Sequence, residues 1–92
     1  MILEIVTPET YLLSTEVDSV AVPGTNGSFE MLNQHASIVS SMVKGVIKFK
    51  GKNVVIEDKF RDRFTSINKG YQIEIDGGII EMKNNKITIL VD

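Results

Sequence analysis

Apolar and polar residues alternate with a period of two along much of this 92-residue chain. The alternation is found in four segments: 2–6, 46–50, 71–75 and 87–91. Successive side chains of a strand point to opposite faces, so this pattern predicts strands with one buried face. No segment carries the 3.6-residue apolar stripe of an amphipathic helix. The chain is therefore predicted to be all-β.

Turn-forming residues fall between the predicted strands. They are Pro23-Gly24, Asn26-Gly27, Gly51-Lys52-Asn53, Asn68-Lys69-Gly70, Gly77-Gly78 and Asn84-Asn85. Glycine and asparagine accept the positive φ of tight turns, and Asn-Gly is the commonest two-residue hairpin signal. Further strands are predicted at 11–22, with an interruption at Ser14-Thr15, and at 54–56. The charged run Glu57–Arg63 has too few apolar anchors for a stable helix, so it is predicted to be a hairpin end.

One core is expected, because a chain of this length folds as a single domain, here residues 1–92. The core should consist of inward-facing aliphatic residues and one aromatic residue: Leu3, Ile5, Val20, Val22, Ile38, Ile47, Phe49, Ile73, Ile75, Ile87, Ile89 and Val91. Either a sandwich of two sheets or a small barrel would bury these side chains.

The formal net charge of −2 conceals an uneven distribution along the chain. All ten lysine and arginine residues lie at or after Lys44, while five acidic residues precede it. One interpretation is an acidic face that meets a basic partner. The other is a solvated surface on which both signs mix once the chain has folded.

The stretch from Val17 to Met42 combines several special positions. Its first strand leads into two closely spaced turn signals, which together predict an exposed tip that carries Phe29 as an exposed aromatic residue. The single histidine, His35, follows, and after it a serine-rich strand through Ile38. His35 is either a surface histidine bonded to the backbone or a contact residue at a protein interface.

The sequence offers little equipment for catalysis. With one histidine and no cysteine, a zinc site built from His and Cys ligands is excluded. Asp76 lacks the supporting acidic spacing of a calcium loop. His35 could pair with Ser37, Ser40 or Ser41 as a nucleophile and base, but no elbow motif or orienting third residue accompanies them. A non-enzymatic protein without a metal or cofactor is therefore predicted.

Four runs of the sequence carry a resemblance to a known family: Glu4–Glu9 (EIVTPE), Val17–Phe29 (VDSVAVPGTNGSF), His35-Ala36 and Gly77–Asp92 (GGIIEMKNNKITILVD). In this order, and over nearly the whole chain, they resemble the N-terminal β-sandwich domain of the epsilon subunit of the F-type ATP synthase. The resemblance implies a flattened sandwich of two antiparallel sheets, which agrees with the all-β pattern.

The role that the resemblance implies is that of a non-catalytic central-stalk subunit in the rotor. Such a subunit couples rotation of the membrane-embedded c-ring to the gamma subunit, at the cytoplasmic face of a bacterial inner membrane. Contacts with the c-ring are implied for Asn26, Gly27, Ser28, Phe29 and Glu30. Contacts with the gamma subunit are implied for His35, Ser40 and Met42.

Three departures from the family pattern change what is expected. Ser28 and Glu30 stand where the family has Gly-Glu-Phe-Gly, and Asn33-Gln34 precede His35 where it has Pro-Gly. The segment between Phe49 and Tyr71 is longer by about one hairpin, which would enlarge a sheet or the gamma interface. The sequence ends at Asp92, where the family normally continues into a C-terminal helical hairpin, so neither a nucleotide site nor inhibition by that hairpin is expected.

A small β-barrel module for single-stranded nucleic acid or oligosaccharide is the alternative function. A sequence pI of about 5.3 and the lack of a basic groove with interleaved aromatic residues weigh against nucleic acid. The N-terminus lacks the basic region of a signal peptide, and no apolar run approaches membrane-spanning length. No direct insertion into a membrane is expected.

Overall fold

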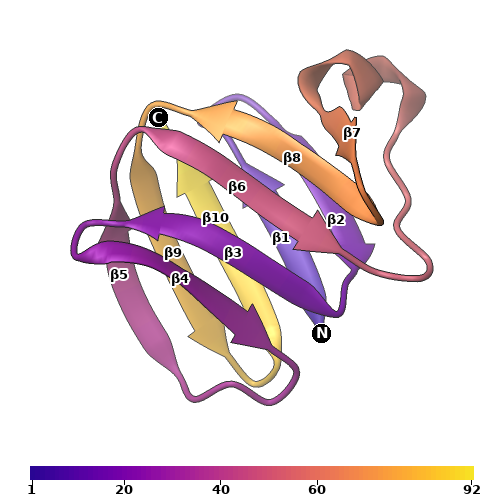
Figure 1. The fold of residues 1–92 in the computed structure, drawn as a ribbon. Helices are drawn as coiled ribbons and strands as arrows, with labels where there is room; N and C mark the ends of the chain where they lie inside the picture. Colours follow the sequence, from indigo (N-terminus) through magenta and orange to yellow (C-terminus); the bar gives the residue numbers. More distant parts are fainter.

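The computed structural model describes all residues from Met1 to Asp92 and contains ten strands and one 3₁₀-helix (Figure 1). The elements in chain order are β1 Ile2–Val6, β2 Tyr11–Glu16, β3 Ser19–Gly24, β4 Gly27–Leu32, β5 Ile38–Met42, β6 Gly45–Lys50, η1 Asp58–Arg63, β7 Thr65–Ile67, β8 Gly70–Ile75, β9 Gly78–Lys83 and β10 Lys86–Val91. The all-β prediction is confirmed.

The strands lie in two layers that face each other across the core (Figure 1). The first, here called the β1 layer, has the order β2-β1-β10-β9-β5, and the second, the β3 layer, has the order β4-β3-β6-β8-β7. Because β5 also pairs with the end of β3, one hydrogen-bonded sheet curls over to form both layers. The predicted sandwich is confirmed, and its two layers are parts of one continuous sheet.

One strand pair runs parallel, unlike the rest. The first strand, β1, lies beside the last strand, β10, and both run in the same direction, with Ile2 opposite Lys86 and Val6 opposite Leu90. The alternation of residues predicts which side chains of a strand are buried, but it contains no information on which strands become neighbours. The prediction of purely antiparallel sheets is therefore wrong for the pair β1 and β10.

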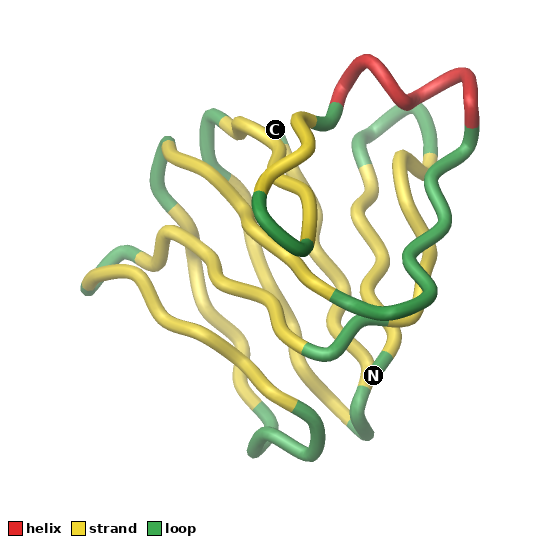
Figure 2. The backbone as a smooth tube through the Cα atoms, turned by 45° about the vertical axis from the view of Figure 1, so that its right-hand side comes forward, coloured by secondary structure: helices red, strands yellow, loops and turns green.

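The two layers join at the end of β3, where Gly24 pairs with Met42. Figure 2 shows that strands make up most of the chain and that the one helical segment, in red, lies at their periphery. The backbone N–H of Val43 donates to the Pro23 carbonyl at 2.9 Å. Pro23 and Gly24 are thus the last residues of β3, and the turn predicted at this position is wrong. The chain reverses instead at Thr25 and Asn26, with Gly27 at a φ of 115°.

Gly24→Ala is expected to lower the free energy of unfolding by about 1–3 kcal/mol, because the space beside Gly24 is filled. A Cβ atom there would lie 2.7 Å from Cε1 of Phe29 and 2.8 Å from the Gly27 carbonyl oxygen. Urea denaturation measures the loss, with Ser28→Ala, a change at an exposed neighbouring position, as the control. Equal midpoints for the two variants would show that the Phe29 ring moves aside without cost.

The core is one cluster of 21 buried residues drawn from both layers. Every predicted core residue is buried except Ile38, which is half-buried against the cluster. The sequence pattern missed ten further members: Met1, Leu12, Leu13, Val17, Met31, Met42, Ile56, Phe64, Ile80 and Met82. Leu12 and Leu13 are both buried because the pairing of β1 with β2 shifts at a bulge, which breaks the simple alternation.

The segment 51–64, here called the insert, differs from its predicted structure. Residues 54–56 form no strand, and Asp58–Arg63 form a 3₁₀-helix, so the predicted strand and hairpin end are both wrong. The helix is stabilised from outside itself, since Ile56 before it and Phe64 after it are both buried in the core. The ring of Phe64 meets Phe49 edge-on, with the centroids 5.8 Å apart.

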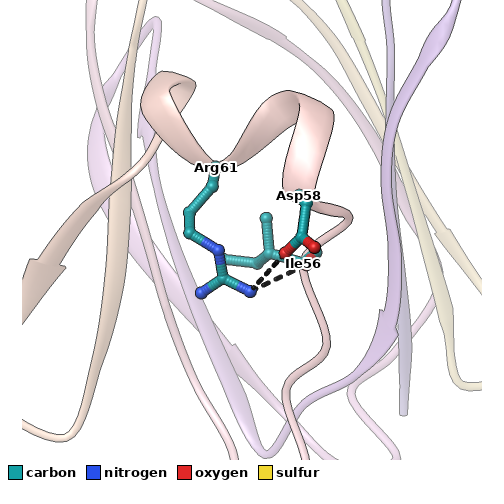
Figure 3. A network of polar contacts seen from close by, with 3 residues as sticks. All are labelled: Ile56, Asp58 and Arg61. Carbon is teal, nitrogen blue, oxygen red and sulfur yellow. Dashed lines mark hydrogen bonds and ion pairs between the residues drawn. The ribbon is translucent and has the colours of Figure 1, made fainter.

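Polar contacts hold the middle of the insert in place. The guanidinium of Arg61 donates to the Ile56 carbonyl at 3.4 Å and to the Asp58 carboxylate at 3.2 Å (Figure 3). The N–H of Val55 donates to Oγ1 of Thr15 on the neighbouring edge strand β2, at 2.9 Å. Thr15 is the one buried polar residue of the molecule, and this bond satisfies it. The insert is therefore attached along the edge of the β1 layer.

The structure contains no helix with the length and apolar character of a membrane span.

Candidate protein interfaces

The tip of the β3–β4 hairpin presents small polar groups. Asn26, Gly27, Ser28 and Glu30 are exposed. Phe29 is half-buried and packs on the core beside Gly24, so the prediction of an exposed aromatic residue is corrected. The inward position follows from the pairing of Phe29 with the buried Val22 on β3.

The tip is braced against β5. The N–H and the hydroxyl of Thr25 both donate to the Ser41 carbonyl, at 3.2 and 3.1 Å. Two hydrogen bonds to one acceptor hold the hairpin end to the strand that joins the two layers. Asn26 and Ser28 are therefore carried on a fixed turn rather than on a free loop.

His35 lies at the far end of the same segment, in the loop between β4 and β5 (Figure 1). It is exposed, its N–H donates to the Leu32 carbonyl at 3.1 Å, and its Nδ1 lies 2.7 Å from the Ala36 carbonyl oxygen. The N–H of Gln34 donates to the Asn85 side chain at 2.8 Å, which ties the loop to the β9–β10 turn. The histidine is thus bonded to the backbone and still presented to solvent.

The structure separates the residues that the resemblance grouped together. Ser40 and Met42 lie on β5, whose end carries the brace of the tip, while His35 precedes that strand. Ser40 is half-buried, and Met42 is 5% exposed and belongs to the core. Met42 can support an interface from beneath, but its side chain is not on the surface.

An apolar row crosses the outer face of the β1 layer. It consists of Ile79, Leu90, Val6 and Tyr11, which occupy paired positions on the adjacent strands β9, β10, β1 and β2. Ile79 and Leu90 are each 50% exposed, Tyr11 is 62% exposed, and Val6 is half-buried. Paired side chains on neighbouring strands lie about 5 Å apart, so these four form one continuous strip.

A row of paired positions on the outer face of the β3 layer is polar except for one alanine. It consists of Glu30, Ala21, Lys48, Gln72 and Thr65. One outer face of the sandwich is thus suited to water, and the other exposes a strip of apolar side chains. Exposed apolar groups gathered in this way are typical of protein contact surfaces.

The sequence pattern missed the apolar row. Its members follow or precede inward-facing residues, and alternation predicts only that they face outward. A signal was nevertheless present: the neighbours in the pairs Ile79-Ile80 and Leu90-Val91 are both apolar, where a half-exposed strand normally has one polar member. Recognising that these positions meet required the register of strands far apart in the sequence.

No group of three or more His, Asp or Glu side chains is placed to hold a metal ion. The surface features described above are a braced polar tip, an exposed histidine loop and an apolar row, all of which suit contacts with other macromolecular surfaces. The fold is that of a small β-sandwich domain. The family model described as "ATP synthase, Delta/Epsilon chain, beta-sandwich domain" matches residues 1–61, and the chain belongs to this family.

Curated relatives agree with this assignment. The chain is 40% identical over 90 residues to the ATP synthase epsilon chain of Campylobacter curvus, covering 98% of this chain and 59% of that protein. It is 35% identical over 92 residues to the ATP synthase epsilon chain of Maridesulfovibrio salexigens, covering 100% of this chain and 54% of that protein. The chain thus spans little more than half the length of these relatives.

Solved structures share the fold. A chain of the mitochondrial ATP synthase central stalk and c-ring of Tetrahymena thermophila matches with a TM-score of 0.71 at 15% identity, covering 99% of this chain and 62% of that one. A chain of the Euglena gracilis mitochondrial ATP synthase matches with a TM-score of 0.76 at 17% identity, covering 99% and 49%. At these identities the likeness concerns the β-sandwich fold.

Proposed function

We propose that this domain is a non-catalytic central-stalk subunit of an F-type ATP synthase and couples rotation of the c-ring to the gamma subunit. Membership of the epsilon family supports the complex, and the structure supports a docking role. Its place would be the cytoplasmic face of a bacterial inner membrane, where it is held by its partners.

The apolar row is the observation that carries this proposal. A subunit that transmits torque must be fixed to its partner over an area, since a single flexible contact would slip. Partly exposed apolar and aromatic side chains in register on four strands provide such an area, and burying their apolar surface on association is favourable by about 25 cal/mol per Å². We assign the gamma contact to this face, together with His35 and Ser40.

The c-ring contact is assigned to the tip, at Asn26, Gly27, Ser28 and Glu30, with Phe29 packed behind them. The brace from Thr25 to β5 supports this assignment, because it connects the tip to the strand that joins the two layers. A force on the tip would then pass into the β1 layer, which carries the apolar row.

Co-expression with the gamma subunit of the same organism, followed by gel filtration, tests the proposal. A one-to-one complex that survives the column is expected. If the domain remains monomeric beside folded gamma, the stalk assignment is wrong and only the fold assignment stands.

Glu30→Lys is expected to weaken retention on isolated c-rings by about two- to fivefold, while the complex with gamma stays intact. Glu30 is exposed on the tip strand, and a basic c-ring loop would meet a reversed charge there. Pull-down of the gamma-bound domain by c-rings in detergent measures the effect. Glu74→Lys, at an exposed acidic position on β8, is the matched control. Equal losses of c-ring retention in both variants would show that Glu30 does not take part in the c-ring contact.

A further inference from the structure

Two hollows adjoin the apolar row, one alongside Ile79, Leu90 and Val6 and one at its Tyr11 end. The first, of about 350 Å³, is lined by Val6, Thr7, Pro8, Gly78, Ile79, Leu90, Val91 and Asp92. The second, of about 200 Å³, is lined by Tyr11, Leu12, Leu13, Ser14, Val55 and Glu57. The second hollow therefore lies between the edge strand β2 and the insert. Each could accept a side chain from a covering surface.

Charge separates these two hollows from the others. Each contains one carboxylate, of Asp92 or Glu57, and neither is lined by a lysine or arginine. The three remaining surface hollows all include lysine, at Lys52 and Lys69, at Lys44, and at Lys83 and Lys86. The apolar row thus has one carboxylate residue beside Leu90 and one near its Tyr11 end, and no basic side chain lines either hollow.

The insert adds an apolar side chain to the row. Val55 is 68% exposed and lines the second hollow together with Tyr11, the last member of the row. Its backbone is fixed, because its N–H is bonded to Thr15 and the next residue, Ile56, is buried. An exposed valine on a fixed backbone loses little conformational freedom when a partner covers it.

We propose that the surface which covers the apolar row also covers the insert at Val55 and Glu57, and that it is an apolar strip flanked by lysine or arginine side chains. The identification of this surface with the gamma subunit rests on the proposed function. The row would be buried against the apolar strip, and the basic side chains would reach Glu57 near the Tyr11 end of the row and Asp92 beside Leu90.

The charges decide which partner is preferred. A covering surface with acidic flanks would bring like charges together at both hollows, which is unfavourable, whereas a basic one gains at both. Glu57 is 67% exposed and its contact with Lys59, at 3.7 Å, is weak, so Glu57 can exchange that lysine for a partner's cation. Such pairs mainly raise the association rate and are screened by salt.

Val55→Asp tests the extension of the row. We expect this substitution to raise the Kd of the complex with gamma about tenfold. The control, Thr65→Asp, changes an exposed strand position on the β3 layer and should leave the Kd unchanged. Because Val55 is exposed, the variant should fold, and circular dichroism checks this. Leu90→Asp, which places the same charge within the row itself, is the comparison. If Val55→Asp bound gamma with wild-type affinity while Leu90→Asp bound it weakly, the extension of the interface to the insert would be wrong and the proposed function would stand. Wild-type affinity for both would show that this face is not the gamma surface and would overturn the inference, whereas the absence of any gamma complex with the wild-type domain would refute the proposed function itself.

Glu57→Gln combined with Asp92→Asn tests the charges. The association rate with gamma should fall severalfold at about 0.01 M salt and differ little from wild type at about 0.15 M. An unchanged or faster association rate at low salt would contradict the proposal that basic side chains flank the covering surface. Sedimentation of the isolated domain tests whether a second copy of the domain covers this surface instead. A dimer that Val55→Asp disrupts would show that it does, and would contradict the proposal.

Discussion

Replacing Phe49 with alanine is expected to lower the free energy of unfolding by about 3–5 kcal/mol. Phe49 is fully buried on β6, in the middle of the β3 layer. Its ring meets Phe64 edge-on at 5.8 Å and stacks on Tyr71 at 6.0 Å. Removal of the ring leaves a cavity that three segments border, and the strands cannot close it without breaking their hydrogen bonds.

The insert should respond first. Phe64 is held through its contact with Phe49, and small domains have only about 5–15 kcal/mol of stability in total. Urea denaturation measures the global loss, and amide exchange shows whether the insert opens earlier than β6. The control is Phe60→Ala, a half-buried ring of the insert, for which a loss of about 1 kcal/mol is expected. Similar losses in both variants would contradict the central place given to Phe49.

What the sequence could predict was local. The run Tyr71–Ile75 alternates without a fault and forms β8, and Asn84-Asn85 forms the expected turn with φ values of 52° and 60°. Positive φ at two successive residues is what a type I′ turn requires, and asparagine tolerates it. Such features depend on neighbouring residues alone, so they can be found without knowing the partners of each strand.

Features set by distant partners could not be predicted. The helix at Asp58–Arg63 lacks a sufficient apolar stripe of its own, and it forms because the chain on both sides is anchored in the core. Met42 was assigned to a surface by resemblance, although it shares the inward phase of β5 with Ile38 and Ser40, while Val39 and Ser41 face outward. The apolar row exists only through the pairing of β9, β10, β1 and β2.

The order of the strands explains how one small sheet could serve two partners. The tip lies on the β3–β4 hairpin, and β5 connects it through β9 to the strands that carry the apolar row. Backbone hydrogen bonds run without a gap from one surface to the other. A load applied at the tip would therefore be shared by the ladder and would not depend on a single flexible linker.

Leu90→Asp is expected to have the largest effect on association with the gamma subunit. Leu90 is central in the apolar row, paired with Ile79 on one side and Val6 on the other, and half of its side chain is exposed in the free domain. Covering a carboxylate there without a partner charge would cost about 3–5 kcal/mol, a rise in Kd of about a hundred- to several-thousandfold. Calorimetric titration of the domain with gamma measures the change.

The fold should survive this substitution, because the new carboxylate points into water in the free domain. Thr65→Asp adds the same charge to an exposed strand position of the other layer and should bind gamma like wild type. A shorter apolar replacement, Leu90→Ala, separates lost contact area from buried charge and should weaken binding far less. If Leu90→Asp bound gamma as tightly as Thr65→Asp does, the outer face of the β1 layer would not be the gamma surface.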